Sequence, residues 1–302
     1  MTERQFGPYK VNLSNEDKVL FPDDNLTKGD LVDYYEAVAD HMLPHLKDRP
    51  LALHRFPDGI EGEGFVQQRA SDHFPDWLDT ERTRRSGNAS GTVEHPVCNK
   101  LASLVYLADQ AAISLHRWLS RRGRLDEPDL LIFDLDPSTD EFAPVIEAAR
   151  QTSGLMEELG ATPFLMTTGS RGVHVVMPLR RNENFDEVRS VAQDMASVLA
   201  DRHPDTLTIE HRKRKRGKRI YLDVLRNAYG QTAVAPYSVR GRSGAPVATP
   251  VSPDELDNPD LRPDGFTIRD VPERLEKRGD PWQGMKQHAV SIVKVRKALK
   301  KL

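Results

Sequence analysis

The spacing of hydrophobic and polar residues predicts short strands and helices along most of the chain. Apolar side chains recur every three or four residues between about 28 and 47, which predicts an amphipathic helix. Thr27 to Asp30 form a capping-box sequence at its start. Leu51–Phe56 is predicted to be a strand that ends in a Pro-Asp-Gly turn, with 65–68 as its hairpin partner. Residues 1–26 are expected to be polar and irregular, and 70–97 to form loops or short strands.

A second group of elements follows from residue 99 onward. Residues 99–109 have one apolar face and predict a helix. In 113–118 apolar and polar residues alternate, which favours a strand, and continuation of the helix is the alternative. Residues 130–136 begin with an unbroken apolar run and end before Pro137, as in a buried strand. A helix over about 140–159 is expected to end at Gly160.

The remaining pattern completes a fold of mixed type. We expect strands at 164–166, 173–177 and 219–224, a helix at 185–199, an ordered loop with short strands at 228–253, and a basic helix at the C-terminal end. Several strands are hairpin-like and do not alternate regularly with helices. The pattern therefore predicts an α+β fold rather than a parallel βαβ array.

Composition places the chain among soluble globular proteins. Its 302 residues are 38% hydrophobic and 29% charged, enough for one large domain or two small ones. No stretch approaches the ~18 apolar residues of a membrane helix, and the first ten residues lack a signal-peptide core. Cys98 is the only cysteine, which excludes a disulfide framework and a cysteine-based zinc site. We expect a reducing, cytoplasmic location.

Charge is distributed unevenly along the chain. The net charge is −3, but from Asp205 to Arg242 there are ten basic and three acidic residues. Such a local positive field favours contact with solvent or with nucleic-acid phosphates.

The first candidate for chemistry is the pair Asp134 and Asp136. Side chains alternate along a strand, so both carboxylates are expected on one face. Adjacent carboxylates repel each other unless a positive charge lies between them, and a divalent hard cation is the usual solution. The alternative is a strand end whose aspartates cap the next helix.

Asp223 is the candidate third carboxylate. It lies within an apolar strand, where a charged group is costly unless it is paired or binds a metal. Together with the first pair it would complete a three-carboxylate site for two divalent ions about 4 Å apart, as used in phosphoryl transfer. The alternative is a salt bridge to Arg219 or Arg226.

A glycine-containing loop at 169–174 is the candidate phosphate site. Glycines let backbone N–H groups approach an anion, and Ser170, Arg171 and His174 add side-chain donors. Arg226 and Arg240 follow later in the chain, and the planar guanidinium fits phosphate oxygens. The alternatives are a hairpin turn with His174 in the core, and two surface arginines.

Three aromatic residues could stack on bases: Phe65, Trp77 and Trp118. For the two tryptophans, packing in the core is the favoured alternative.

Taken in order, the motifs resemble a known family. D-L-D at 134–136, G-S-R-G-V-H at 169–174 and the block from Tyr221 to Arg242 resemble the archaeo-eukaryotic primase superfamily, and more closely the polymerase domain of bacterial DNA ligase D. The likeness extends from D-K-V-L-F-P at 17–22 to P-V-A-T-P at 246–250. It implies a primase-polymerase fold of two packed lobes of mixed or antiparallel sheet flanked by helices, with the catalytic site in the cleft between them. It also implies one catalytic domain over 1–285 and a basic C-terminal helix over 286–302.

The resemblance assigns roles to particular residues. It implies that two divalent cations, Mn²⁺ or Mg²⁺, are held by Asp134, Asp136 and Asp223. It places the nucleotide at His116, Ser170, Arg171, His174, Arg226 and Arg240. It places DNA at Lys18, Lys28, Arg55 and Phe65, with the two lysines on the 5′-phosphate across a gap.

The sequence departs from the family pattern on the template side. The family's F-F-Q-K is here Phe65-Val66-Gln67-Gln68, so one aromatic residue and one lysine are missing. The family's K-R-(Y/W)-P-D-G is here His54 to Gly59, and Arg171 stands where lysine is usual. We therefore expect template binding to differ.

The implied function is a nucleotidyltransferase that adds NTPs or dNTPs to a primer 3′ end, in gap filling or non-homologous end joining. The resemblance implies gapped or broken DNA with a 5′-phosphate, Ku and a DNA ligase as partners, a monomer, a nucleoid-associated location and acceptance of ribonucleotides. Two alternatives stay open. One is a haloacid-dehalogenase-like phosphatase that uses Asp134 and Asp136; the other is a non-catalytic DNA-end-binding module.

Overall fold

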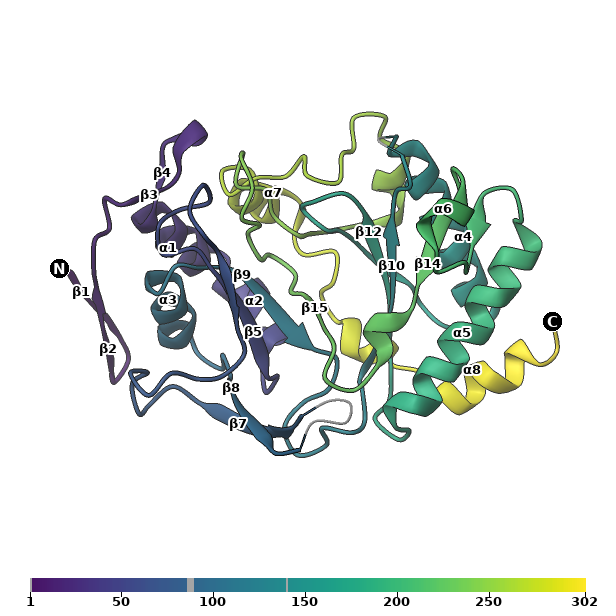
Figure 1. The fold of residues 1–302 in the computed structure, drawn as a ribbon, viewed down its shortest axis with the longest axis horizontal. Coiled ribbons are helices and arrows are strands. Elements are labelled where there is room, and N and C mark those ends of the chain that lie inside the picture. Colours follow the sequence, from purple (N-terminus) through teal and green to yellow (C-terminus); the bar gives the residue numbers. More distant parts are fainter. Residues whose placement is uncertain (1, 86–89, 140) are drawn as a thin grey trace. The chain divides into compact units, whose positions relative to one another are not determined.

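A computed structural model describes residues 2–85, 90–139 and 141–302 (Figure 1). The chain forms two compact units, each assembled from three segments. Unit 1 comprises the residues up to Trp118 together with Thr232–Thr249 and Phe266–Asp280. Unit 2 comprises Leu119–Gln231, Pro250–Gly265 and Pro281–Leu302.

Unit 1 is built on a four-stranded antiparallel sheet in the order β15-β9-β5-β6. The strands are β5 (Leu51–Arg55), β6 (Phe65–Gln67), β9 (Ala112–Trp118) and β15 (Thr232–Val234). The predicted hairpin between 51–56 and 65–68 is therefore confirmed. Residues 113–118 form a strand, because β5 and β15 supply hydrogen-bonding partners on both sides.

Helices cover the hydrophobic core of unit 1. They are α1 (Lys28–Ala37), α2 (Ala39–Leu46), α3 (Leu101–Asp109) and α7 (Val271–Arg278). The capping box at Thr27 and Asp30 is confirmed. The single helix expected over 28–47 is instead two helices, because Val38 (φ −96°, ψ 4°) leaves the helical conformation.

The remaining strands of unit 1 form three hairpin-like pairs. They are β1 (Thr2–Phe6) with β2 (Tyr9–Leu13), β3 (Val19–Phe21) with β4 (Leu26–Thr27), and β7 (Thr80–Arg84) with β8 (Thr92–Pro96). A 3₁₀ turn, η1 (Pro22–Asp24), joins β3 to β4. The expectation of an irregular N-terminal stretch was wrong, since Val11 and Leu13 anchor β2 in the core.

Unit 2 is built on a six-stranded sheet in the order β13-β14-β10-β12-β11-β16. The strands are β10 (Leu130–Asp136), β11 (Phe164–Thr167), β12 (Val173–Pro178), β13 (Leu207–Thr208), β14 (Ile220–Asp223) and β16 (Thr249–Val251). The long helices α4 (Ala143–Glu158) and α5 (Phe185–Arg202) pack against the central strand β10 (Figure 1). The apolar run at 130–136 is thus the centre of this sheet, as predicted.

Short helices complete unit 2. They are α6 (Lys213–Arg216), η2 (Leu225–Asn227), η3 (Pro253–Asp257), η4 (Met285–His288) and α8 (Ile292–Leu299). The basic C-terminal helix expected over 286–302 is shorter, since η4 and an isolated bridge between Val290 and Leu179 precede α8. The helix expected over 140–159 begins at Ala143, and Asp140 lies outside the described residues. Gly160 follows it with φ +76°, as its C-terminal role requires.

In the described part of the chain, no helix is long and apolar enough to cross a membrane.

Candidate active site

A row of polar side chains crosses the centre of the unit 2 sheet. The strand register places His174 of β12 and Asp223 of β14 directly opposite Asp134 of β10. Directly opposite residues of antiparallel strands project to the same face with neighbouring Cβ atoms. Asp136, two positions after Asp134, shares that face and lies opposite Tyr221. The sheet therefore brings the three predicted carboxylates and His174 to one surface.

Asp134 is the most enclosed of the carboxylates, with 9% of its surface exposed. Its Oδ1 lies 3.3 Å from Nε2 of His174, and its Oδ2 lies 3.4 Å from Nε of Arg226. Burial alone raises the pKa of an aspartate. Here the neighbouring His174 and Arg226 outweigh burial and lower the pKa of Asp134 to about 2. Asp134 is therefore held as a carboxylate.

Asp136 has the opposite electrostatic setting. Partial burial and the negative charge of Asp134 raise the pKa of its carboxyl. Gly172 lies directly against it: a Cβ at that position would be 2.2 Å from the carbonyl oxygen of Leu135 and 2.7 Å from Oδ1 of Asp136. The close approach of the loop to β10 therefore requires glycine.

The three aspartates of this row are of the ligand type that hard divalent cations prefer. Three carboxylates on one face supply the oxygen ligands that Mg²⁺ and Mn²⁺ prefer. The raised pKa of Asp136 shows that further positive charge would stabilise the ionised pair. Over residues 2–85, 90–139 and 141–302, no three His, Cys, Asp or Glu side chains converge as a metal-ligand group. Asp223 instead accepts the backbone N–H of Leu225 at 2.8 Å, and Asp134 faces His174 and Arg226.

The predicted phosphate loop joins β11 to β12 beside this row. Gly169 has φ +63°, in the left-handed region that favours glycine. The Oγ1 of Thr168 accepts a hydrogen bond from the backbone N–H of Gly172 at 3.2 Å. The backbone N–H of Thr168 donates to the carbonyl of Gly172 at 3.0 Å. These bonds close a tight loop that carries Ser170 and Arg171 at its tip.

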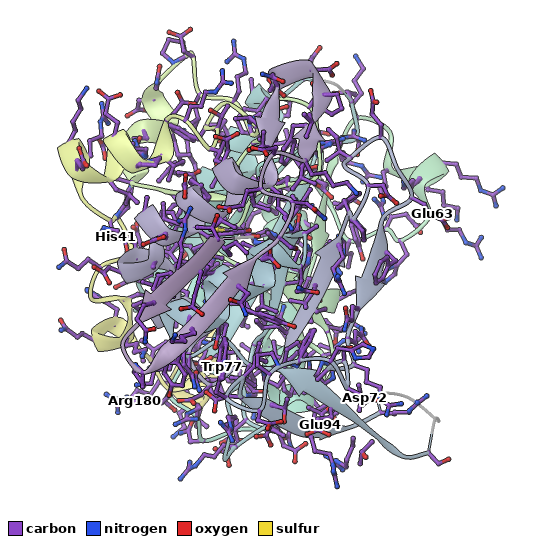
Figure 2. The ribbon with its side chains drawn as sticks, turned by 90° about the vertical axis from the view of Figure 1, so that its left-hand side faces the viewer. His41, Glu63, Asp72, Trp77, Glu94 and Arg180 are labelled. Carbon is purple, nitrogen blue, oxygen red and sulfur yellow. The ribbon has the colours of Figure 1, made fainter. Side chains whose placement is uncertain are left out.

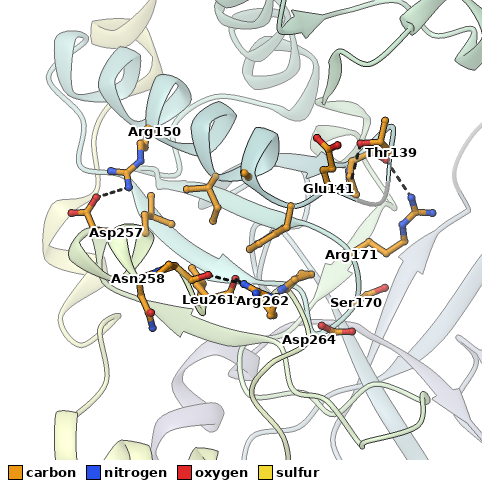
Figure 3. Close-up of a pocket in the computed structure, with 17 residues that line it drawn as sticks. Thr139, Glu141, Arg150, Ser170, Arg171, Asp257, Asn258, Leu261, Arg262 and Asp264 are labelled. Carbon is orange, nitrogen blue, oxygen red and sulfur yellow. Dashed lines mark hydrogen bonds and ion pairs between the residues drawn. The ribbon is translucent and has the colours of Figure 1, made fainter.

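A pocket of about 790 Å³ lies next to the loop, within unit 2 (Figure 3). Ser170 and Arg171 form one side of it, and Arg150 and Arg262 contribute further guanidinium groups. Arg150 is paired with Asp257 at 2.5 Å, and Arg171 donates to the carbonyl of Pro137 at 3.4 Å. Polar and cationic groups thus extend away from the aspartate row.

Arg226 is held in place by its neighbour Asn227. The buried Asn227 amide accepts the N–H of Ile132 at 2.9 Å and donates to the carbonyl of Ile132 at 2.7 Å. It therefore continues the pairing with β10 after β14 has ended. The side chain of Arg226 is 43% exposed and reaches Asp134 from this anchored turn.

The other two nucleotide candidates, His116 and Arg240, belong to unit 1. The His116 ring stacks on His54 with centroids 4.4 Å apart and an angle of 17°. Burial and the charge of Arg240 lower the pKa of His54, so Arg240 lies near the same pair. The backbone N–H of Arg240 donates to the carbonyl of Pro246 at 2.7 Å.

The template candidates lie side by side: Phe65 is exposed on the edge strand β6, and Arg55 is half-buried on the neighbouring strand β5. Phe65 is 47% exposed, and the guanidinium of Arg55 lies 5.5 Å from the centre of its ring. Arg55 is fixed by the carbonyl of Gln110 at 2.8 Å and by Gln67 at 2.8 Å. Val66, where the family has a second aromatic residue, is 54% exposed. The ring of Phe65 is therefore exposed, and its stacking on a base stays a prediction.

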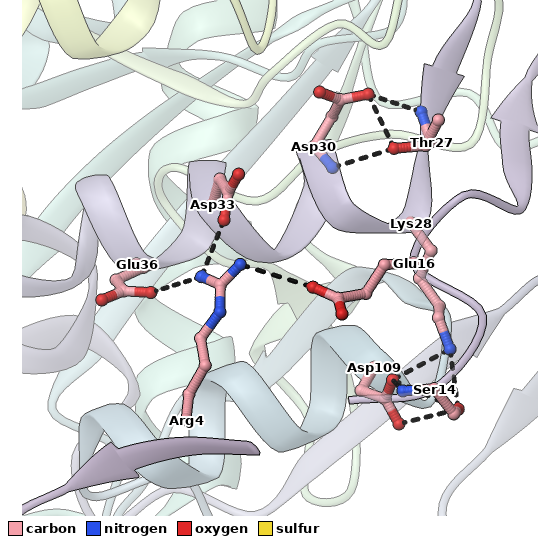
Figure 4. A network of polar contacts seen from close by, with 9 residues as sticks. All are labelled: Arg4, Ser14, Glu16, Thr27, Lys28, Asp30, Asp33, Glu36 and Asp109. Atoms are coloured by element: carbon pink, nitrogen blue, oxygen red, sulfur yellow. Dashed lines mark hydrogen bonds and ion pairs between the residues drawn. The ribbon is translucent and has the colours of Figure 1, made fainter. Parts of the chain in front are cut away.

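The two lysine candidates are in contrasting environments. Lys18 is half exposed and pairs with Asp58 at 2.7 Å. Lys28 is buried: its Nζ lies 2.9 Å from Oδ1 of Asp109 and 3.0 Å from the hydroxyl of Ser14 (Figure 4). In this conformation Lys28 ties α1 to α3 and to the chain before it. A phosphate contact for Lys28 stays a prediction that requires this ion pair to open.

Two aromatic candidates belong to the core. Trp118 is 2% exposed. Trp77, labelled in Figure 2, packs 5.3 Å from Tyr9 and 5.9 Å from Tyr106 against the core of unit 1. Core packing, rather than base stacking, is therefore the confirmed interpretation for both tryptophans.

Three residues at these sites were missed in the sequence: Asn227, Thr168 and His54. Asn227 and Thr168 directly adjoin the predicted Arg226 and Gly169, and both are buried polar residues. The signal that could have identified Asn227 and Thr168 was a polar residue directly beside a predicted functional residue. For His54 the signal was its position in a motif in which the family has lysine.

Comparison with known proteins gives a consistent result. The family model described as "LigD, primase-polymerase domain" matches residues 27–282. The chain is 34% identical over 281 residues to the multifunctional non-homologous end joining protein LigD of Pseudomonas aeruginosa, covering 90% of this chain and 32% of that protein. It is 32% identical over 274 residues to the LigD of Mycolicibacterium smegmatis, covering 90% of this chain and 35% of that protein. The chain thus spans about a third of the length of these relatives.

A solved structure agrees with the sequence relatives. The polymerase domain of Mycobacterium tuberculosis ligase D in complex with DNA superposes with a TM-score of 0.86 and 31% identity, covering 92% of this chain and 99% of that one. The expected α+β primase-polymerase fold is confirmed, and these matches do not favour the phosphatase or the non-catalytic alternative. The chain belongs to the family of LigD primase-polymerase domains.

Proposed function

We propose that this chain is a template-directed nucleotidyltransferase that extends a primer 3′ end in gap filling or non-homologous end joining. The observation that carries the proposal is the row of Asp134, Asp223 and His174 across three strands, with Asp136 on the same face. Two divalent cations held by the three aspartates would stabilise the attacking and leaving oxygens of the phosphoryl transfer. Mn²⁺ or Mg²⁺ suits these ligands.

The protein's own groups would position and neutralise the nucleotide. His174 and Arg226 keep Asp134 ionised and oriented. Ser170 and Arg171 stand at the tip of the adjoining loop, where they could bind triphosphate oxygens. His116 and Arg240, which belong to unit 1, are the other two residues proposed to bind the nucleotide. Catalysis would then consist mainly of positioning and charge stabilisation.

Extension of a gapped duplex tests the site. We expect Asp136→Ala to reduce nucleotide incorporation at least about 100-fold, because it removes a cation ligand needed in the transition state. Asp201→Ala, which removes an exposed carboxylate of α5, is the matched control and should extend like the wild type. Equal extension by Asp136→Ala and the wild type would contradict the assignment. Supplying NTPs and dNTPs in parallel measures the proposed acceptance of ribonucleotides.

We further propose gapped or broken DNA with a 5′-phosphate as the substrate, on the nucleoid, with Ku and a DNA ligase as partners. The related M. tuberculosis domain, which was solved in complex with DNA, supports the DNA part of this proposal. Lys18, which is half exposed and pairs with the exposed Asp58, is the phosphate candidate that needs less rearrangement than the buried Lys28.

A 5′-phosphate on the gap should stimulate wild-type extension, and Lys18→Ala should lose most of that stimulation. Lys10→Ala, which removes an exposed lysine paired with Glu3, is the control. Stimulation that survives unchanged in Lys18→Ala would exclude this lysine from phosphate recognition.

A further inference from the structure

The ring of Phe56 lies between two glycines that come from different parts of unit 1. One edge of the ring, Cδ1 and Cε1, faces Gly64, where a Cβ would lie 2.3 Å from Cε1. The opposite edge, Cδ2 and Cε2, faces Gly241, where a Cβ would lie 2.6 Å from Cε2. Two carbon atoms cannot approach each other this closely, so each position admits only glycine while the ring stays in place.

Space, rather than backbone conformation, is the reason for both glycines. Neither Gly64 nor Gly241 has a φ angle in the left-handed region that favours glycine. The backbone would therefore tolerate a side chain at either position, and the ring of Phe56 excludes it. Because the ring packs directly on the backbone at both edges, its position fixes the positions of both chain segments.

The two segments carry residues to which the proposed function gives different roles. Gly64 directly precedes Phe65, the template candidate on the edge strand β6. Gly241 directly follows Arg240, a nucleotide candidate. Phe56 itself directly follows β5, the hydrogen-bonded partner of β6. The ring of Phe56 therefore connects the template candidate of unit 1 to a nucleotide candidate of the same unit.

The chain on either side of this contact is anchored by hydrogen bonds that do not involve the ring. The backbone N–H of Phe56 donates to the carbonyl of Ala111 at 3.0 Å. Three residues after Gly241, the backbone N–H of Gly244 donates to the carboxylate of Asp24 at 2.6 Å. Loss of the ring should therefore leave both segments folded and change how they are placed against each other.

We propose that Phe56 is a positioning residue that sets Arg240 relative to Phe65, so that the incoming nucleotide is bound in register with the template base. The inference rests on the proposed function, in which Arg240 contacts the triphosphate and Phe65 stacks on a base. Phe56 acts through these two residues. A misplaced Arg240 loses a contact that the ground state and the transition state share, so the KM for the nucleotide rises while kcat is retained.

Steady-state extension of a gapped duplex separates the two constants. Phe56→Leu keeps apolar bulk but lacks the two ring edges. We expect it to raise the KM for the templated nucleotide about tenfold and to change kcat by less than about twofold. The preference for a matched over a mismatched nucleotide should fall by a similar factor, because only the matched nucleotide depends on the register with the template.

Two variants serve as controls for Phe56→Leu. Phe56→Tyr retains the ring and should keep the wild-type KM and the wild-type preference for the matched nucleotide. Phe6→Leu removes a half-buried ring from β1, which pairs with β2 and lies outside the four-stranded sheet. It should leave both quantities unchanged, whatever its effect on stability.

Gly241→Ala tests the same contact from its other side. The new methyl group would press on Cε2 of Phe56 and should likewise raise the KM about tenfold. When Phe56→Leu and Gly241→Ala are combined, the methyl group meets a smaller side chain, so the two effects should not add. A KM raised by the product of the two single effects would overturn the proposal.

Failure of the inference can be distinguished from failure of the proposed function. A wild-type KM and a wild-type nucleotide preference in both Phe56→Leu and Gly241→Ala would overturn the positioning role and leave the polymerase assignment intact. Gly241→Ala retains the ring, so it provides this test on its own if urea unfolding shows that Phe56→Leu does not fold. No extension by the wild type with any nucleotide would instead contradict the proposed function.

Discussion

The two aspartates of the D-x-D motif differ in their surroundings although they share one strand face. Asp134 is buried between His174 and Arg226, and its pKa is lowered to about 2. Asp136 lies further toward the strand end, where burial and Asp134 raise its pKa. The row therefore combines one carboxylate that the protein keeps ionised with one whose ionisation calls for added positive charge.

Gly172→Ala should disrupt the site more than a methyl group ordinarily does. The new Cβ would collide with the Leu135 carbonyl and with the Asp136 carboxylate, both on the central strand. We expect a loss of roughly 1–3 kcal/mol in the free energy of unfolding and a fall in extension of about 100-fold or more. Urea unfolding and gapped-duplex extension check the two expectations.

Gly154→Ala is the control for this substitution. Gly154 lies within α4, and apart from its chain neighbours and the backbone of its own helix nothing lies within 4 Å of the position its Cβ would take. Alanine in a helix interior should raise stability by about 0.5–1 kcal/mol and leave extension unchanged. If Gly172→Ala behaved like Gly154→Ala, the close approach of loop and strand would not constrain the site.

At the residue scale, motif spacing predicted which carboxylates meet but not what contacts them. The alternation in β10 was sufficient to place Asp134 and Asp136 on one face. The burial of Lys28 could not be predicted, because its partner Asp109 is distant in sequence and belongs to another helix. The stack of His54 on His116 likewise depends on a strand pairing that neither residue encodes locally.

At the scale of elements, the segment 235–240 after β15 is held by tyrosine hydroxyls. The Tyr35 hydroxyl donates to the carbonyl of Ile113 at 2.6 Å and accepts the N–H of Val239 at 3.2 Å. The Tyr34 hydroxyl donates to the carbonyl of Tyr237 at 2.9 Å. Helix α1 therefore fixes both β9, which carries His116, and the segment that carries Arg240.

Tyr35→Phe should weaken this connection. It removes a buried hydroxyl and leaves the Ile113 carbonyl and the Val239 N–H without that partner, at a cost of about 1–3 kcal/mol. Burial raises the pKa of Tyr35 to about 12, so the hydroxyl is present as a donor throughout the working pH range. Denaturant unfolding measures the change.

Tyr106→Phe is the matched control for Tyr35→Phe. The Tyr106 hydroxyl makes one long bond of 3.4 Å to the carbonyl of His73, so its loss should cost at most about 0.5 kcal/mol. Equal destabilisation by the two variants would show that the Tyr35 hydroxyl has no special role.

Element boundaries were predictable where local signals were strong. Thr27, Asp30 and Gly160 marked helix ends correctly. The break between α1 and α2 at Val38 was not predictable, since the apolar spacing continues through it. Tertiary packing, rather than local sequence, determines where the helix breaks. The choice of a strand at 113–118 required partner strands, one of which comes from residues 232–234.

At the scale of the whole molecule, a buried polar cluster links stability to pH. His45 of α2 lies 3.9 Å from Asp280, whose other oxygen accepts the Tyr237 hydroxyl at 2.5 Å. Burial lowers the pKa of His45 to about 4, despite the opposing effect of Asp280. Below about pH 6.5 the unfolded chain therefore binds a proton at this position that the native protein does not.

The free energy of unfolding should fall as the pH drops from about 6.5 to about 4, by at most about 3 kcal/mol from His45. Urea unfolding at pH 7 and pH 5 measures the change. His45→Gln should show a smaller difference between the two pH values, whatever its absolute stability. An unchanged difference would mean that His45 titrates normally in the native protein.

The segmental make-up of the two units has a consequence for synthesis. The chain passes from one unit to the other after Trp118, Gln231, Thr249, Gly265 and Asp280. Domains usually fold in order as the N-terminal one leaves the ribosome. Here unit 1 lacks α7 until residue 280 has emerged, and unit 2 lacks Trp282, whose ring donates to the Leu165 carbonyl at 2.8 Å. Neither unit can be completed early, so we expect both to reach the native state only as translation of this stretch of the gene ends.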